Sequence, residues 1–432
     1  MIKTNTKSKK KILFLVNNPY NFKGFFQKEI YILSKYYDLN FLVYKSGFDN
    51  LKIKEYQSYW FRLLKKNKIV KKIWWLDQTS YTNIFENLKF NRNFVKIINQ
   101  IKSSNIDFFL CPNKFHYWED IFCEYFKNKN IYCYLINPST GLDLFNSLKE
   151  FKKSLKKGKI ENKEKFNVIS DSLAMHNFNT KTVKKKKFIS FFFEKLNIFM
   201  CKNVNHYFLP YLLVKKTFNP NSIQNKLNLN FLDFKKILIF NEEYKDYLSN
   251  FSLKNKQVFV YKSSNLKNKI SNFNWIYAFS GTRDKKVLEK ILKYLLILKK
   301  IKKLNKISFK GHPYWKHEDI GKDFLKILRK NYIKYDLIKN YENIDYLNYY
   351  GVITSPSTIL LESTFNNPSI KLIGIKHDKY NVSRSLFEFY KIVNKKIIWE
   401  PNINNLKKYL LKKKIKQNFT SNNLKEFFTK KI

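Results

Sequence analysis

The chain of 432 residues has little glycine, proline and arginine, with 9 Gly, 9 Pro and five Arg among its 84 basic residues. Alanine is also scarce, while Lys, Asn, Ile, Phe and Tyr are over-used, which is the joint bias of a genome dominated by A/T-rich codons. Hydrophobic residues make up 44% and aromatic residues 18% of the chain. These fractions exclude a disordered tail or a low-complexity polymer, and they indicate a folded protein of two or three domains.

Cysteines are few, and Cys111, Cys123, Cys133 and Cys201 form no CxxC pair and lie beside no matching pair of histidines. The spacing therefore favours neither a zinc site nor a disulfide framework, and we expect a reducing, cytoplasmic location. No run approaches the roughly 18 uncharged apolar residues that a membrane span needs. The apolar run 12–16 has the length of a strand and no cleavage site follows it, so we expect no signal peptide.

Acidic residues are also scarce, because 33 Asp and Glu face 84 Lys and Arg and leave a formal net charge of +51. Codon bias alone explains part of this excess of lysine. The remaining positive field would attract anionic partners, which include a membrane surface, a nucleic acid and nucleotide-activated substrates.

Short apolar runs alternate with helical patterns, and this alternation predicts parallel α/β units. The runs interpreted as strands are 12–16, 39–44, 106–110, 131–136, 236–240, 257–261, 275–279, 307–310, 351–354 and 370–375. The predicted fold class is α/β with two Rossmann-like domains facing a cleft. Domain one covers 1–230 and includes a Lys-rich helical insertion over about 142–230; domain two covers 231–400, and a basic helical tail covers 401–432. Open parallel sheets bind ligands at the carboxyl ends of their strands, so the chemistry should lie in the loops that follow them.

The predicted strand 307–310 runs into the sequence KGHP. A histidine held by Pro313 at the end of a strand can present a ring nitrogen to a phosphate or leaving group, which makes His312 a candidate. Lys310 adds a positive charge next to Gly311. The alternative is a turn histidine whose hydrogen bonds are satisfied by the backbone.

The predicted strand 351–354 runs into a turn rich in hydroxyl groups, and a helix is expected to begin near Ser357. The hydroxyls of Ser355, Ser357 and Thr358, with the free N–H groups of a helix N-terminus, would cradle a phosphate. Glu362 would accept hydrogen bonds from ribose hydroxyls. The alternative is that Ser355 or Ser357 is an ordinary N-cap and Glu362 a first-turn residue placed by the helix dipole.

Two further turns also follow predicted strands. Gly281 and Thr282 form a small-residue turn before a cation and extend the candidate nucleotide site. Asn17, Asn18 and Gly24 lie in the loop predicted after the first strand, where they would meet an acceptor. Ordinary connecting turns are the alternative in both places.

Segments 310–313 and 354–358 together resemble the His-Pro and serine-rich motifs of bacterial sialyltransferases and polysialyltransferases, which are glycosyltransferases of the GT-B fold. Similar elements occur in glycerophosphotransferases of teichoic acid synthesis and in other capsule-building transferases. The resembling region covers about residues 300–375. The resemblance implies that His312 and the hydroxyls of Ser355, Ser357 and Thr358 hold the phosphate of a cytidine nucleotide and assist departure of the leaving group.

The acidic-acidic-Gly motif, which supplies the general base of sialic acid transfer in that family, is missing. The comparable turn, 137–143, reads NPSTGLD, and Asp143 is its nearest acid. Glu119 and Asp120 are further options. General base catalysis contributes roughly 10²- to 10⁴-fold to the rate of a reaction. The missing motif therefore weakens the expectation of sialyl transfer, whereas the argument for a nucleotide site does not depend on it.

These observations lead to the hypothesis of an inverting, metal-independent glycosyltransferase without a cofactor, whose substrate is a nucleotide sugar, CMP-linked in preference. It would transfer a sugar, sialic acid or a related acidic sugar, to a glycan or lipid-linked acceptor of a bacterial capsule or lipooligosaccharide. We expect a cytoplasmic protein with peripheral association at the inner face of the membrane. A glycerophosphate or phosphoalditol transferase is the alternative. A basic nucleic-acid-binding protein is a weaker one, because no arginine cluster, zinc finger or RNP-type aromatic pair accompanies the charge.

Overall fold

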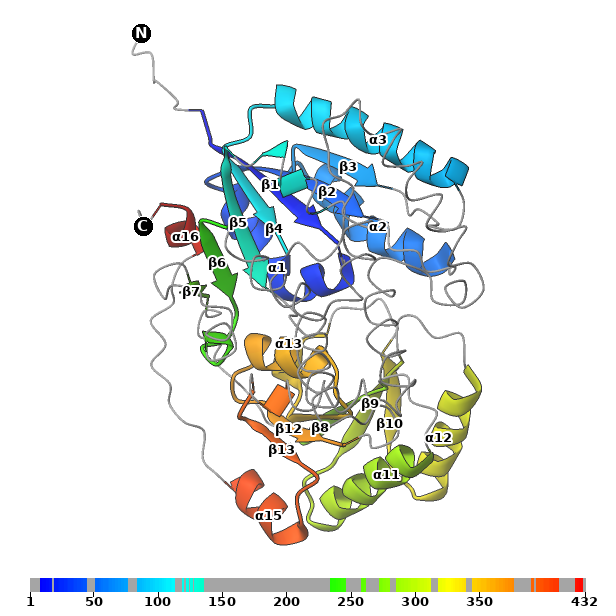
Figure 1. Cartoon of the computed structure of the whole chain (residues 1–432). Helices are drawn as coiled ribbons and strands as arrows, with labels where there is room; N and C mark the ends of the chain where they lie inside the picture. The colour runs from blue at the N-terminus through cyan, green and yellow to red at the C-terminus, as the bar shows by residue number, and fades with distance from the viewer. Residues whose placement is uncertain are drawn as a thin grey trace, which may run out of the picture.

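A computed structural model of the chain describes residues 8–17, 19–44, 51–76, 84–112, 119, 122–123, 125–126, 128–135, 234–245, 258–261, 272–279, 285–311, 318–338, 344–376, 390–391, 394–411 and 424–429. These residues form two parallel β-sheets, and each sheet is covered by helices. The two α/β units lie one above the other in Figure 1.

The first sheet has seven strands in the order β3-β2-β1-β4-β5-β6-β7. Its strands are β1 (Lys11–Val16), β2 (Asp38–Tyr44), β3 (Lys72–Leu76), β4 (Phe108–Cys111), β5 (Asn130–Leu135), β6 (Lys236–Ile239) and β7 (Val258–Val260). Every neighbouring pair is parallel. The strand order reverses between β1 and β4, as it does in a doubly wound Rossmann-like sheet.

The second sheet has six strands in the order β10-β9-β8-β11-β12-β13. Its strands are β8 (Asn274–Ala278), β9 (Lys306–Lys310), β10 (Tyr335–Ile338), β11 (Gly351–Thr354), β12 (Lys371–Gly374) and β13 (Ile397–Trp399). These strands are also parallel, and their order reverses between β8 and β11. The predicted fold class, α/β with two Rossmann-like domains, is therefore confirmed.

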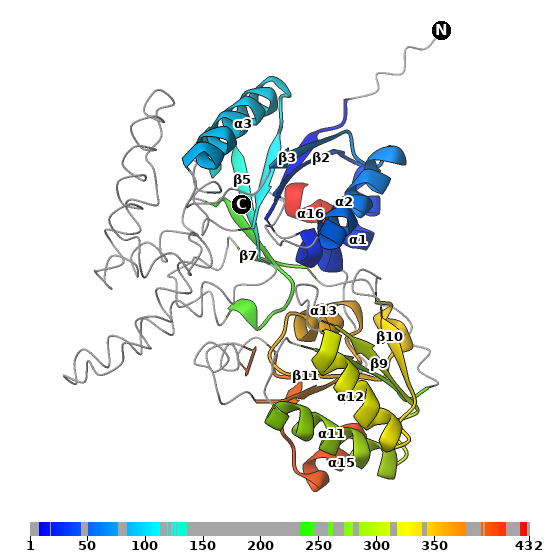
Figure 2. The ribbon, with the colours of Figure 1, turned by 90° about the vertical axis from the view of Figure 1, so that its right-hand side faces the viewer.

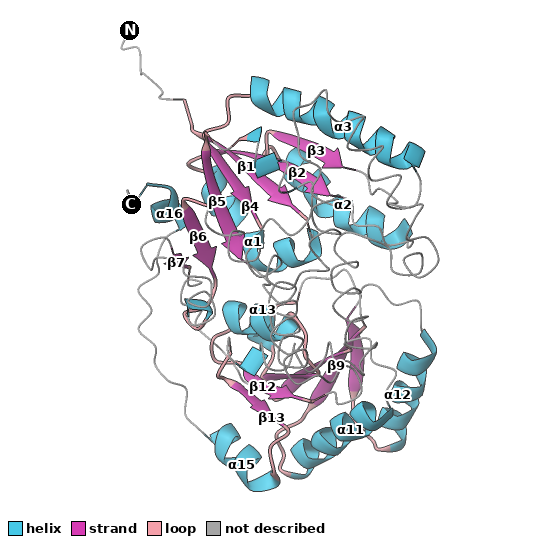
Figure 3. Cartoon of the chain, viewed as in Figure 1, coloured by secondary structure: helices cyan, strands magenta, loops and turns pink. Residues whose placement is uncertain are grey.

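Helices cover both sheets, as the secondary-structure colouring in Figure 3 shows. In the first unit, α1 (Pro19–Ser34) and α2 (Leu51–Lys66) lie on one face and α3 (Ile84–Ser103) on the other (Figure 2). In the second unit, α11 (Lys285–Lys300), α12 (Glu318–Lys330) and α15 (Ile403–Leu411) cover the face away from the first unit (Figure 1). Helix α13 (Ile359–Asn366) lies between the two units, next to α1.

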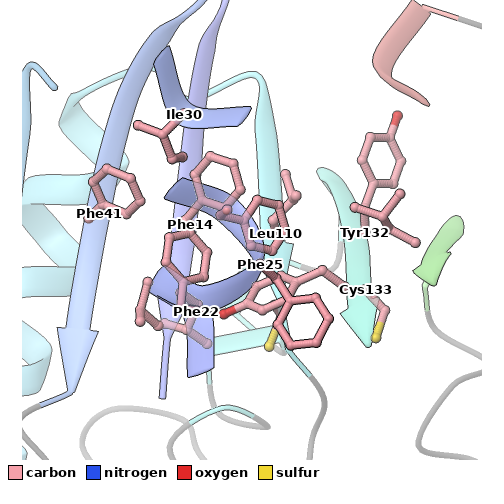
Figure 4. Packing of buried hydrophobic residues seen from close by; sticks show 14 of the residues in the cluster. Phe14, Phe22, Phe25, Ile30, Phe41, Leu110, Tyr132 and Cys133 are labelled. Atoms are coloured by element: carbon pink, nitrogen blue, oxygen red, sulfur yellow. Dashed lines mark hydrogen bonds between the residues drawn. The ribbon is translucent and has the colours of Figure 1, made fainter. Parts of the chain in front are cut away.

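The core of the first unit is built largely from phenylalanine. Phe14 of β1 stacks on Phe41 of β2 with ring centroids 5.4 Å apart, and Phe22 of α1 stacks on Phe26 at 4.6 Å. Figure 4 shows Phe14, Phe22 and Phe41 gathered between these strands and the helix. Strand β1 is buried from Ile12 onward because helices cover both faces, which is why it reads as an uninterrupted apolar run.

An aromatic cluster joins the two units. Phe365 of α13 lies 5.4 Å from Phe25 of α1, 5.2 Å from Phe240 and 5.7 Å from Tyr261, measured between ring centroids. All four side chains are buried. One continuous hydrophobic core therefore extends from the first sheet to α13 and the near face of the second sheet.

The boundary between the units differs from the predicted one. Strands β6 and β7 complete the first sheet, so the second unit begins after residue 261 and not at 231. The segment 401–432 is not a separate tail: Leu406 and Leu410 of α15 join the second core, while Phe427 and Phe428 of α16 (Leu424–Thr429) pack in the first. The predicted helical insertion over 142–230 lies outside the described residues. The hydrophobic patterns indicated strands correctly, but only packing decides which sheet a strand joins.

Two helix starts also differ from the predictions. Helix α1 begins at Pro19, within the segment 17–24 that was predicted as a loop, because proline is favoured in the first turn, where no N–H partner is needed. Gly24 therefore lies inside α1 and not in a loop. Helix α13 begins at Ile359, with Thr358 as its N-cap, two residues after the predicted start.

Candidate functional site

The carboxyl ends of β9 and β11 lie at the same edge of the second sheet, because these parallel strands flank β8. Ligands of open parallel sheets bind outside the carboxyl ends of the strands at the point where strand order reverses, which is here between β8 and β11. Lys310 ends β9 and Thr354 ends β11. Two of the segments selected from the sequence therefore share one edge of one sheet.

The hydroxyl groups after β11 have different roles. Thr354 is buried, and its hydroxyl donates a hydrogen bond to the carbonyl of Ala278 in β8 (Oγ1···O 2.6 Å), so it ties the two strands together. Ser355 is buried as well, whereas Ser357 and Thr358 are half-buried. The turn therefore has a structural hydroxyl at its base and more accessible ones toward the helix.

The start of α13 bears on the structural alternative for this turn, and Glu362 does lie in the first turn of the helix, as that alternative expects. The N-cap is Thr358, not Ser355 or Ser357, and its side chain makes no capping hydrogen bond. The Ser357 and Thr358 carbonyls accept from the N–H groups of Leu360 and Leu361 (3.1 and 3.0 Å). The hydroxyls of Ser357 and Thr358 thus lie at the N-terminal end of α13, where the helix dipole favours an anion.

Lys310 provides a cation at this edge. Its side chain is buried, and burial lowers the pKa of its ammonium group, while Glu362 and Tyr349 act in the opposite direction. Gly311 follows it and is half-buried. A buried ammonium group that is partly desolvated binds an anion more strongly than a surface lysine does, because less water screens the interaction.

Glu362 is the acid of the site. Its Oε1 accepts a hydrogen bond from the hydroxyl of Tyr346 (3.0 Å), in the short helix η5 (Tyr346–Asn348). Burial raises the pKa of the Glu362 carboxyl above its usual value, and Lys310, Tyr346 and Lys23 oppose that rise. Lys23 comes from α1, so the first unit contributes a charge to this site.

Gly24 explains how α1 comes so near. A Cβ atom at Gly24 would lie 2.6 Å from Cδ of Glu362 and 2.7 Å from its Oε2, a distance that real Cβ atoms do not occupy. The Gly24 carbonyl also accepts a hydrogen bond from the side-chain amide of Asn366 (Nδ2···O 3.2 Å). The acceptor role predicted for Gly24 remains a prediction, but its contact is with the second unit.

The first unit has its own polar pair at the carboxyl edge of β1. The side-chain amide of Asn17 donates to Oε1 of Glu119 (2.8 Å), and Glu119 is fully buried. Strand order reverses beside β1 in this sheet too, so the pair occupies the corresponding position in the first unit.

The surroundings of Glu119 are largely apolar. Cys111 and Cys133 are buried, and desolvation raises the pKa of both thiols, with a further contribution from the negative charge of Glu119. The pKa of Tyr134 is raised for the same two reasons, and its hydroxyl donates to the carbonyl of Leu15 (2.5 Å). These thiol and phenol groups therefore stay protonated at neutral pH.

Six of the predicted site residues lie outside the described residues. They are His312, Pro313, Gly281, Thr282, Asn18 and Asp143. Their roles remain predictions. The sequence interpretation missed Lys23 and Tyr346. Lys23 lies in the segment 17–24 that was predicted as a loop after the first strand, but no local signal distinguishes it or Tyr346, because their importance comes from interaction with Glu362.

Neither a metal cluster nor a membrane span is found in the described part of the chain. Over those residues no group of three or more His, Cys, Asp or Glu side chains could hold a metal ion. No helix described in the structure is both long enough and apolar enough to span a bilayer.

Comparison with known proteins finds solved structures of similar fold but no related sequence family. No family model matches the chain, and no curated protein sequence matches it. Similar solved structures include UGT73P12 of Glycyrrhiza uralensis complexed with glycyrrhetinic acid 3-O-monoglucuronide, at a TM-score of 0.48 and 10% identity, covering 91% of this chain and 81% of that one.

Two further structures with similar folds come from microorganisms. MurG of Acinetobacter baumannii has a TM-score of 0.43 and 10% identity, over 94% of this chain and 91% of that one. The UDP-GlcNAc 2-epimerase of Methanocaldococcus jannaschii, in complex with UDP-GlcNAc and UDP, has a TM-score of 0.43 and 11% identity, over 94% of both chains. Likeness at this level does not assign an activity, so the function has to be argued from the site.

Proposed function

We propose that the chain is a glycosyltransferase that transfers a sugar from a nucleotide donor to a glycan or lipid-linked acceptor. The observation that carries this proposal is the convergence of Lys310, the Ser355–Thr358 turn and Glu362 at the carboxyl ends of β9 and β11. This set offers a cation and hydroxyl donors for a phosphate, and a carboxylate acceptor for a ribose, on one sheet edge.

In this proposal the second unit binds the donor. The hydroxyls of Ser357 and Thr358 and the Lys310 ammonium group hold the phosphate at the N-terminal end of α13, and they stabilise the charge that develops on it when the sugar departs. Glu362 accepts from the ribose hydroxyls. By the family resemblance, His312 adds a hydrogen bond to the leaving phosphate, and Gly281, Thr282, Gly311 and Pro313 complete the turns around it.

The first unit would bind the acceptor and activate its hydroxyl. Asn17, Asn18 and Gly24 are the predicted acceptor residues, and the base is a carboxylate, for which Asp143, Glu119 and Asp120 are the candidates. The described geometry supports Glu119 as a candidate, because Asn17 holds its carboxylate at the edge of β1. Attack from that side would displace the nucleotide in line and invert the anomeric centre.

The finer parts of the proposal concern the donor and the acceptor. The resemblance to sialyltransferases favours a CMP-linked acidic sugar and a capsule or lipooligosaccharide acceptor. The formal charge of +51 supports peripheral binding to an anionic membrane, where lipid-linked acceptors are found.

Titration calorimetry with CMP, CDP, UDP and GDP at moderate salt tests the donor site. We expect one nucleotide to bind selectively to the wild type, and His312→Ala and Ser357→Ala to weaken that binding about tenfold or more, as expected when a charge-assisted hydrogen bond is lost. Lys408→Ala, which removes an exposed lysine of α15, is the matched control and should bind like the wild type.

The outcomes separate the alternatives. Selective binding of CMP supports a CMP-linked donor, and selective UDP or GDP binding keeps the transferase but changes its donor. Preference for CDP, followed by transfer of a glycerophosphate group in product analysis, would replace the proposal by the phosphoalditol transferase. Weak, equal binding that no variant alters would refute the donor site.

A further inference from the structure

Lys23 and Lys310 come from different units and act on the same carboxylate. Lys23 is in α1 of the first unit and Lys310 ends β9 of the second, and both interact electrostatically with Glu362 and with each other. Lys23 is half-buried and Lys310 is buried. The charged groups that surround Lys23 thus come from β9 and α13, while Tyr346 of η5 bonds the same carboxylate.

The backbone of α1 keeps Lys23 in this position. Gly24 leaves room for the Glu362 carboxyl group to lie against α1, and the hydrogen bond from Asn366 to the Gly24 carbonyl fixes that turn of the helix on α13. One residue further along, Phe25 packs on Phe365. Three consecutive residues of α1 are therefore directed at the second unit, and Lys23 is the charged one.

Among the described residues, two ammonium groups act on one carboxyl group at this site. Burial and the repulsion from Lys310 lower the pKa of Lys23 to about 8, although Glu362 acts in the opposite direction. The attraction of one carboxylate thus does not offset the cost of holding the Lys23 ammonium group there. An additional anion between Lys23 and Lys310 would reduce the repulsion between them and favour the charged form of both.

We propose that Lys23 is a donor-binding residue supplied by the first unit, and that with Lys310 it receives the phosphate group of the nucleotide. This inference rests on the proposed function of the same site and adds to it a residue from the other unit. Binding of the phosphate would then connect the two units directly, since its charge is shared between α1 and the carboxyl end of β9.

Comparing a nucleotide with its nucleoside tests whether Lys23 binds the phosphate. The affinities of CMP and cytidine, and of UDP and uridine, are measured by calorimetry for the wild type, Lys23→Met and Lys28→Met. Lys28 is an exposed lysine of the same helix and is the matched control. We expect Lys23→Met to weaken nucleotide binding about tenfold while nucleoside binding is unchanged, because a hydrogen bond to a charged group is lost.

The pH dependence gives a second, independent measurement. The phosphate of CMP stays ionised between pH 7 and 9, whereas Lys23, with a pKa of about 8, loses most of its charge over this range. Binding of CMP to the wild type should weaken as the pH rises. Lys23→Arg, which keeps its charge, should retain nucleotide affinity at pH 7 and show a smaller decrease toward pH 9.

Two results overturn the inference in distinguishable ways. If Lys23→Met binds CMP and UDP as tightly as Lys28→Met does, while His312→Ala and Ser357→Ala lose binding, Lys23 has no role and the proposed function stands. If the wild type binds neither nucleotide more tightly than its nucleoside, the donor site itself is wrong. An equal loss of nucleotide and nucleoside binding in Lys23→Met would indicate a structural role and would also overturn the inference.

Discussion

The two parallel sheets have the same topology at their centres, but the described side chains at the carboxyl edges of their strands differ: a buried carboxyl group lies at the first edge and a buried lysine at the second. At the first edge, Asn17 holds the buried Glu119 among neutral thiols and a tyrosine. At the second edge, Lys310 lies beside a hydroxyl-rich turn, and Lys23 of the first unit reaches the same site. The topology creates a binding position in each sheet. The side chains after the strands decide whether it suits an anion or supplies a carboxylate, which is why one edge is proposed to bind the donor and the other to activate the acceptor.

The sharpest test of this division is to remove the carboxylates of the first unit. We expect either Glu119→Gln or Asp143→Asn to lower the rate at which nucleotide is released from the donor sugar by about 10²- to 10⁴-fold, the usual contribution of a general base. Chromatography of the released nucleotide measures the rate. The nucleotide affinity of both variants should stay at the wild-type value, because the donor site lies in the other unit.

Two outcomes would contradict these separate roles of the two units. If both variants released nucleotide at the wild-type rate, the first unit would not supply the base. If either variant lost nucleotide affinity, the two edges would not have separate roles.

Phe365→Ala tests how firmly the two units are joined. Phe365 is buried against Phe25, Phe240 and Tyr261, and truncation of a buried phenylalanine typically costs about 3 to 5 kcal/mol. The free energy of unfolding from urea titration should fall by that amount. Tyr332→Ala, which removes a side chain that is 86% exposed, should change it by at most about 0.5 kcal/mol. A loss below about 1 kcal/mol for Phe365→Ala would mean that the junction is loose.

Glu362→Gln tests whether the carboxylate of Glu362 at the proposed donor site recognises the ribose. A carboxylate accepts hydrogen bonds more strongly than an amide oxygen does, so we expect CMP to bind roughly three- to tenfold more weakly. Binding of 2′-deoxycytidine monophosphate should change less, because it lacks one of the ribose hydroxyls. Calorimetry with both nucleotides measures the difference. An equal loss for the two nucleotides would argue against ribose recognition by Glu362.

Gly24→Ala should have the smallest effect. Alanine favours a helix over glycine by up to about 1 kcal/mol, which offsets part of the cost of moving the Glu362 carboxyl group away from the new Cβ. We expect little change in the melting temperature and a weaker nucleotide affinity, by roughly threefold on the scale of a weakened hydrogen bond. In a Glu362→Ala background the same substitution should have no effect on affinity. An equal loss of nucleotide affinity in both backgrounds would show that the contact between Gly24 and Glu362 does not cause that loss.

The sequence predicted the interior of both sheets but missed three strands at their edges. Strands β3, β10 and β13 each lie at one end of a sheet, and most of their residues are exposed or half-buried. Interior strands such as β1 and β11 are buried on both faces and read as continuous apolar runs. Strand β10 (YDLI) includes an acidic residue and β13 (IIW) has three residues, so neither gives a long apolar run. Strand β3 (KIWWL) is apolar after its first residue, and the prediction missed it.

The sequence by itself determined that the chain forms parallel α/β units and that a hydroxyl-rich turn and Lys310 follow two of their strands. Both are local properties, since apolar runs specify buried strands and a strand specifies where the next loop begins. Only the tertiary structure decided that β6 and β7 complete the first sheet, and that Lys23 meets Glu362. These contacts join residues hundreds of positions apart, and they depend on a close approach at Gly24 and on packing around Phe365, which no local pattern encodes.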